Sequence, residues 1–179
     1  QQGFAPAQNS LGFMFDKGEG VLQDKQKAFY WYEKAATQGL AKAQNNLGNM
    51  YYSGDGVSQN KQKAFYWYEK AAKQGLAKAQ LYLKIITLER EAIGGNVTAQ
   101  YNLGLMYYEG QEIEQDYEKA FFWFEKAAVH KNIYAQFYLG WMYDNGKGVS
   151  ADKQKAFYWY KKAAAQGNER AKKRLSDLR

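Results

Sequence analysis

The chain has 179 residues, with 25 Lys and Arg against 18 Asp and Glu, and therefore a net charge of +7. A hydrophobic content of 46% argues against disorder, and the absence of Cys excludes disulfides and thiolate metal sites. A single His excludes a multi-His metal centre, and no apolar run approaches the ~20 residues that span a bilayer. At ~150 residues per domain, the length predicts one compact domain or a short repeat array.

An internal repeat accounts for most of the sequence. The string KQKAFYWYEKAA at Lys25–Ala36 recurs 36 residues further on at Lys61–Ala72, and close variants follow at Tyr117–Ala128 and Lys153–Ala164. The copies predict a single repeat domain made of the units 5–40, 41–76, 77–96, 97–132 and 133–168, followed by a tail at 169–179. Because residues 2–4 match the end of a unit, we expect the chain to be a fragment of a longer array.

Each full unit predicts a pair of helices. The first carries A-x-A-Q-x-x-L-G-x-M-Y, as in Ala41–Tyr51, with its apolar positions on one arc at ~100° per residue. Gly54 is expected to end this helix and Gly75 the second one, because Gly tolerates a positive φ. Short acceptor side chains are expected to cap the second helices, namely Asp24, Asn60, Asp116 and Asp152. One pair cannot bury its apolar stripe alone, so the units must stack into a solenoid.

Three parts of the chain depart from this plan. The third unit has 20 residues instead of 36, which predicts one longer helix running through Leu88–Ile93 and a break in the superhelix. The fourth unit has Gln111-Glu112-Ile113 in place of Gly-Val and Lys131 in place of Gly, so the repeat pattern does not specify its loop and terminal cap. The tail keeps the first-helix pattern at Ala171 and Leu175 but is otherwise polar, as a capping helix should be.

The aromatic residues divide into a framework set and a variable set. Four Trp residues share one position of the second helices, which we interpret as a core position: Trp31, Trp67, Trp123 and Trp159. Four further rings stand on the polar side of these helices: Tyr30, Tyr66, Phe122 and Tyr158. Each is expected to lie over a Lys or loop of the neighbouring unit, and the alternative is that the row forms an outer interface. The fifth Trp, Trp141, stands outside the framework register.

These motifs, in this order and at this spacing, resemble the Sel-one-like repeat (SLR) family, a relative of the tetratricopeptide repeats. The resemblance implies an all-α, right-handed α-solenoid of antiparallel helix pairs. It also implies a non-catalytic module, mostly bacterial, that binds a protein or peptide in its concave groove as an adaptor or as an inhibitor or immunity-type protein. A periplasmic, envelope or secreted location is slightly favoured by the resemblance, and the cytoplasm remains open. The absence of Cys places the chain outside the cysteine-rich branch.

The free arc of the first helices is the predicted partner-binding face. In such solenoids the first helices line the concave side, and these positions vary between units whose framework barely changes. Exposed rings and amides there suit recognition, and nothing in the expected packing demands a Trp or Phe. The predicted residues are Asn45, Asn46, Asn49, Tyr52, Tyr82, Tyr101, Asn102, Leu105, Tyr108, Phe137, Tyr138, Trp141 and Asp144.

Other functions are kept as alternatives. An acidic fourth unit interrupts the basic residues, which argues against nucleic acid and leaves an acidic protein partner, whose association rate would fall with salt. The pattern S-x-x-K at Ser58–Lys61 and Ser150–Lys153 is similar to that of serine β-lactamases, but the companion motifs are absent. A binder of cell-wall fragments or β-lactam-type ligands with weak hydrolase activity is therefore one alternative. An assembly scaffold is another, although we expect a monomer with at most weak self-association through the N-terminal edge. We expect no enzyme activity, cofactor, metal or membrane insertion.

Overall fold

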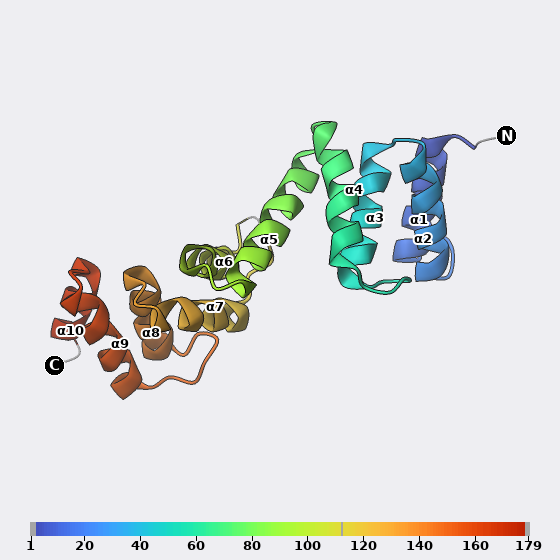
Figure 1. Ribbon diagram of the computed structural model, residues 1–179. Helices are drawn as coiled ribbons and strands as arrows, with labels where there is room; N and C mark the ends of the chain where they lie inside the picture. Colours follow the sequence, from blue (N-terminus) through green and yellow to red (C-terminus); the bar gives the residue numbers. More distant parts are fainter. Residues whose placement is uncertain (1–2, 112, 178–179) are drawn as a thin grey trace. The chain divides into compact units, whose positions relative to one another are not determined.

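The structure is a computed structural model that describes residues 3–111 and 113–177, and these residues form helices joined by turns (Figure 1). The helices are α1 (Ala5–Lys17), α2 (Lys25–Thr37), α3 (Ala41–Ser53), α4 (Lys61–Lys73), α5 (Ala77–Ile93), α6 (Val97–Glu109), α7 (Tyr117–Val129), α8 (Ile133–Asn145), α9 (Lys153–Ala165) and α10 (Glu169–Asp177).

The helices pack as antiparallel pairs, so the all-α repeat fold expected from the sequence is confirmed. Helix α1 packs on α2, α3 on α4, α6 on α7 and α8 on α9, and α10 packs on α9. The chain divides into two compact units at Ile86–Thr87, inside α5. Each compact unit is described by itself below, and a single repeat domain stays a prediction.

The predicted helix ends are confirmed in detail. The side-chain oxygens of Asp24, Asn60, Asp116 and Asp152 accept backbone N–H groups three residues on, at 2.9 to 3.0 Å. Gly54 follows α3 with φ of 86°, and Gly75 follows α4 with φ of 84°. These ends need only local residues, which is why the sequence specifies them.

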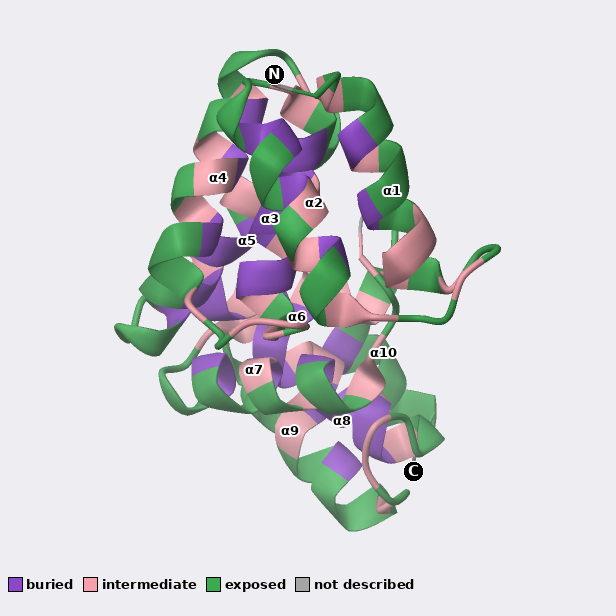
Figure 2. Cartoon of the chain, turned by 90° about the vertical axis from the view of Figure 1, so that its right-hand side faces the viewer, coloured by how far each residue is buried: buried purple, intermediate pink, exposed green. Residues whose placement is uncertain are grey.

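The tightest packing joins a Gly of each first helix to an aromatic ring of its partner. A Cβ added at Gly12, Gly48, Gly104 or Gly140 would lie 2.5 to 2.7 Å from the ring of Tyr32, Tyr68, Phe124 or Tyr160 respectively. These four rings are at most 2% exposed. Figure 2 shows buried and exposed stretches alternating along the helices. The four Trp are less deeply buried than the sequence predicts. They are half-buried, and Trp67, Trp123 and Trp159 pack against the core from its edge, whereas the residue that follows each Trp is fully buried.

The short third unit forms one long helix, as predicted. Helix α5 has 17 residues, whereas each described helix of the four full units has 13. The tail forms α10, where Ala171 is fully buried and Leu175 packs against Tyr160 and its neighbours. In the fourth unit α6 ends at Gly110 with φ of 65°, whereas Glu112 lies outside the described residues. A break in the superhelix stays a prediction.

In three units a hydrogen bond between an exposed and a buried Gln side chain joins the two ends of the unit. The amides of Gln38, Gln74 and Gln166 donate to the side-chain oxygens of Gln8, Gln44 and Gln136, at 2.7 to 2.8 Å. In the fourth unit His130 replaces the donating Gln, and the buried Oε1 of Gln100 has no hydrogen-bond partner. Lys131, the next residue, has φ of 63° where the other full units have Gly.

Restoring the repeat residues at these two positions should therefore stabilise the protein. We expect His130→Gln combined with Lys131→Gly to raise the free energy of unfolding by about 1–3 kcal/mol, since a buried acceptor gains a donor and left-handed strain is relieved. Urea denaturation followed by circular dichroism measures this difference. The reverse change in the fifth unit, Gln166→His combined with Gly167→Lys, should lower stability by a similar amount. A His130→Gln/Lys131→Gly variant no more stable than the wild type would show that the missing Gln–Gln bond has no energetic weight.

Candidate functional site

Of the three predicted amides of the first compact unit, one is buried and two hydrogen-bond to other side chains of the protein. Asn45 is 3% exposed and its Oδ1 has no hydrogen-bond partner, so the expectation that it is exposed on the free face is wrong. Asn46 donates to Asn9 at 3.1 Å, and Asn49 accepts from the hydroxyl of Tyr68 at 2.8 Å. At ~100° per residue Asn45 lies beside the buried Gly48 at the edge of the apolar arc of α3, and it is buried with that arc.

The two predicted rings of the first compact unit are half-buried. Tyr82 stacks on the buried Tyr68, with ring centroids 4.9 Å apart and planes 19° apart. The ammonium group of Lys61 lies 5.4 Å from the ring centroid of Tyr52. These contacts fix both rings and leave part of each accessible.

The second compact unit brings the predicted rings together. We name as the aromatic cluster four half-buried rings of α6 and α8 that surround the buried Phe124 of α7: Tyr101, Tyr108, Tyr138 and Trp141. Tyr138 stacks on Phe124 at 4.8 Å. Tyr108 makes edge contacts with Tyr138 at 4.9 Å and Trp141 at 5.4 Å. Tyr101 lies 6.0 Å from Phe124 and 6.3 Å from Tyr138.

Packing does constrain these rings, contrary to the expectation from the sequence. Tyr138 and Trp141 both pack against the buried core of α7 and α8. The sequence could not show this, because Phe124, the ring on which Tyr138 stacks, comes from a different helix. The aromatic cluster is therefore a rigid surface supported from below.

The other predicted residues of the second compact unit have different surroundings. Asn102 is exposed, and Leu105 is half-buried against the core. Phe137 is half-buried, 5.8 Å from the ring of Tyr160. Asp144 pairs with Lys153 and its side chain is 10% exposed. A role for any of these residues in binding stays a prediction.

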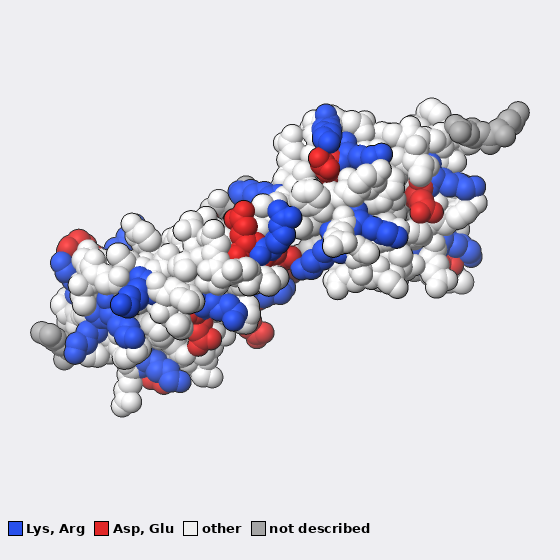
Figure 3. All heavy atoms as spheres, in the orientation of Figure 1, with Lys and Arg blue, Asp and Glu red and all other residues white. Residues whose placement is uncertain are grey.

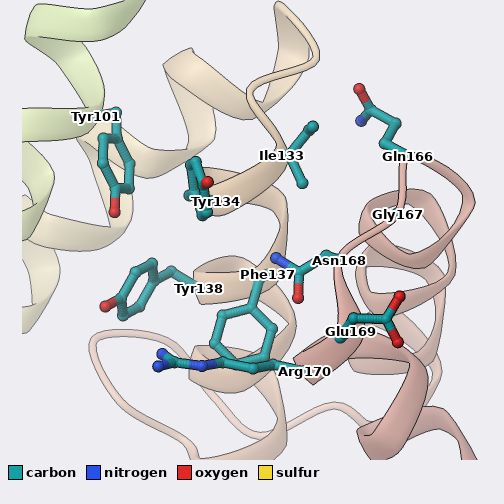
Figure 4. Close-up of a pocket in the computed structure, with 10 residues that line it drawn as sticks. All are labelled: Tyr101, Ile133, Tyr134, Phe137, Tyr138, Gln166, Gly167, Asn168, Glu169 and Arg170. Atoms are coloured by element: carbon teal, nitrogen blue, oxygen red, sulfur yellow. The ribbon is translucent and has the colours of Figure 1, made fainter.

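Next to the aromatic cluster lies a pocket of about 480 Å³, between α8 and the turn that leads from α9 into α10 (Figure 4). Tyr101, Phe137 and Tyr138 line it, so three predicted residues meet there. The sequence analysis missed the other lining residues, which are Ile133, Tyr134, Gln166, Gly167, Asn168, Glu169 and Arg170. The sequence did contain one signal for this pocket: Tyr134 is the aromatic residue at a repeat position that is otherwise Pro6, Lys42, Lys78 and Thr98. In the structure Tyr134 is 60% exposed.

The phenols of the aromatic cluster stay protonated at neutral pH. Burial raises the pKa of Tyr101 to about 12, and the neighbouring Tyr138 and Tyr134 add to the increase. Burial also raises the pKa of Tyr108 to about 12. Each hydroxyl can therefore donate one hydrogen bond to a partner.

The outer rings contact their own helix. The Lys four residues after each ring places its ammonium 4.5 to 4.9 Å from the ring centroid, in the pairs Tyr30–Lys34, Tyr66–Lys70, Phe122–Lys126 and Tyr158–Lys162. The expectation of a Lys or loop from the neighbouring unit is wrong, since side chains four residues apart share one helix face. These rings are nevertheless 47–49% exposed.

The structure offers little support for the catalytic alternative. Ser58 and Ser150 are exposed, and the ammonium of Lys153 is paired with Asp144. No group of His, Asp and Glu in the described ranges could hold a metal ion, and no described helix is long and apolar enough to cross a bilayer. Acidic and basic side chains are interspersed on the face seen in Figure 3.

Four segments of the chain match the Sel1 repeat: residues 5–40, 41–76, 97–128 and 133–168. Together with the paired helices, this match means that the chain belongs to the Sel1 repeat (SLR) family. No curated protein sequence matches the chain.

Several solved structures are similar. A Sel1 repeat protein from Oxalobacter formigenes is 34% identical, with 98% of this chain and 78% of that chain covered and a TM-score of 0.49. A protective antigen of uropathogenic Escherichia coli with an SLR fold is also 34% identical, with a TM-score of 0.51, over 99% of this chain and 41% of that one. An immunity protein from Pseudomonas aeruginosa is 24% identical, with 93% and 67% covered and a TM-score of 0.43.

Proposed function

We propose that this protein is a non-catalytic interaction module that binds a protein or peptide on the free face of its first helices. The observation that carries the proposal is the aromatic cluster. Its rings are held by ring contacts of 4.8 to 6.3 Å and remain half-exposed. Preformed aromatic surfaces lose little conformational entropy on binding, which makes them effective anchors for a partner. Adaptors and inhibitors of the immunity type would both use such a face.

A variant of the exposed part of this face should lose the partner. We expect Asn102→Ala combined with Tyr134→Ala to reduce capture of the partner from the source cell at least about tenfold, because both side chains are exposed and belong to no buried cluster. Replacing Tyr108, Tyr138 and Trp141 instead would remove core packing together with surface. Quantitative affinity capture with the intact chain makes the measurement.

The matched control changes the outer face. Phe122→Ala combined with Tyr158→Ala removes two rings that are 47% and 49% exposed, and capture should be unchanged. Circular dichroism establishes that both variants are folded. Full capture by the Asn102/Tyr134 variant, or loss of capture with the outer variant alone, would refute a binding role for this face.

A further inference from the structure

The pocket beside the aromatic cluster combines aromatic walls with one cation. Tyr134 and Phe137 of α8 form one side, and the other side is the turn from Gln166 to Arg170 at the start of α10 (Figure 4). Figure 4 shows the Arg170 side chain extending across the pocket toward Tyr138. Arg170 lines the pocket together with Tyr101 and Tyr138.

Arg170 has no carboxylate partner within residues 3–111 and 113–177. The adjacent carboxylate, Glu169, is held by Lys172 at 2.8 Å. Gln166 donates to Gln136, and Asn168 accepts the backbone N–H of Ala171, so both polar side chains of the turn are engaged inside the protein. Arg170 is the cation among the residues that line this pocket, and its guanidinium has N–H donors left for a partner.

We infer that the pocket binds an acidic peptide segment of the partner, in which a carboxylate pairs with Arg170 and a neighbouring apolar side chain lies against Tyr134 and Phe137. This inference rests on the proposed function and specifies its partner. A guanidinium presents two parallel N–H donors to a carboxylate, which gives strong and directional pairing. A volume of about 480 Å³ is within the range of small-ligand pockets, which suits one or two side chains of a peptide.

A second pocket of the same chain provides an internal reference. It has about 750 Å³, lies in the first compact unit and occupies the equivalent place in the repeat. There Lys42 stands in the position of Arg170, whereas Ala5, Pro6 and Asn9 replace Ile133, Tyr134 and Phe137. This reference pocket keeps a cation but lacks aromatic walls, so it should bind the apolar side chain poorly.

Titration of the intact chain with short peptides tests the inference. The probes are acetyl-Glu-Phe-Glu-Phe-amide, its Gln-Phe-Gln-Phe analogue without charge and its Glu-Ser-Glu-Ser analogue without rings. Nitrogen-15 NMR reports on the Arg170 side chain and on the backbone amides of residues 133–138. We expect the first probe to shift these signals. Both analogues should bind at least about tenfold more weakly than the first probe.

Variants assign the effect to Arg170. Arg170→Gln should abolish the preference for Glu over Gln in the peptide, whereas Lys161→Gln, the same loss of charge at an exposed position of α9, should preserve it. Equal binding of the Glu-Phe and Gln-Phe probes would overturn the inference. Shifts as large around Lys42 as around Arg170 would overturn it as well.

The subsite and the proposed function fail in different ways. Suppose that Asn102→Ala/Tyr134→Ala abolishes capture of the partner and Arg170→Gln leaves it unchanged. This result would refute the binding of an acidic segment at Arg170 and would still support the binding face. Capture that survives both variants would refute the binding face itself.

Discussion

Replacing Phe124 by Ala is expected to lower the free energy of unfolding of the second compact unit by about 3–5 kcal/mol. Phe124 is fully buried, its ring packs directly against Gly104 of α6, and the ring of Tyr138 stacks on it. Its removal leaves a cavity beneath the aromatic cluster, so partner binding should weaken together with stability. Urea denaturation followed by circular dichroism measures the first effect, and affinity capture at low temperature the second.

Phe122→Ala is the control for this prediction. Phe122 stands on the same helix, but it is 47% exposed and contacts Lys126 on the surface. Its loss should cost about 1 kcal/mol or less. Equal destabilisation by the two substitutions would mean that the interior of the pair α6–α7 is not packed as the structure describes.

Replacing Gly148 by Ala should cost about 3 kcal/mol or more, although it adds one methyl group to a surface turn. Gly148 has φ of 68°, and an added Cβ would lie 2.1 Å from the backbone oxygen of Tyr117 at the start of α7. The turn after α8 would have to move away from the preceding unit, because backbone atoms cannot adjust as a flexible side chain can. Thermal and urea denaturation of the variant measure the cost.

Gly20→Ala separates the cost of the left-handed backbone from the cost of the overlap with a neighbouring backbone. Gly20 has φ of 72°, but the nearest atom to its added Cβ is the flexible Met14 methyl group at 3.6 Å. Its replacement should therefore cost only the left-handed strain, about 1–2 kcal/mol. If Gly20→Ala and Gly148→Ala cost the same, the contact between consecutive units does not explain why Gly occurs at this place in the repeat.

Local signals made the fold predictable. Helix caps at Asp24 or Asp152 need a side chain and an amide three residues apart, and the apolar arc of α3 follows from 3.6 residues per turn. The long α5 followed from the 20-residue spacing of the third unit. The exposed aromatic and amide face was predicted only in part, since Asn45 is buried and Tyr138 is supported from below.

The residues around the pocket show what sequence reasoning lacked. Tyr134 and Arg170 are 36 residues apart and come from different helices, so no spacing within a single helix brings them together. The repeat units differ in sequence at Tyr134, but the sequence analysis did not use this difference, and it did not predict the cation opposite Tyr134. The buried Oε1 of Gln100, which has no hydrogen-bond partner, is a second example. The structure shows that the Gln at the equivalent of His130 donates to the equivalent oxygen in three other units.

The sequence by itself determined the repeat, the helices and their ends, because hydrophobic periodicity, capping and the conformational freedom of Gly act over a few residues. Only the tertiary structure decided which side of each aromatic ring is buried and which Gly touches a neighbouring unit. It also decided where an unpaired Arg170 meets Tyr134 and Phe137. Those outcomes depend on close packing between segments distant in the chain, where tenths of an ångström separate contact from overlap.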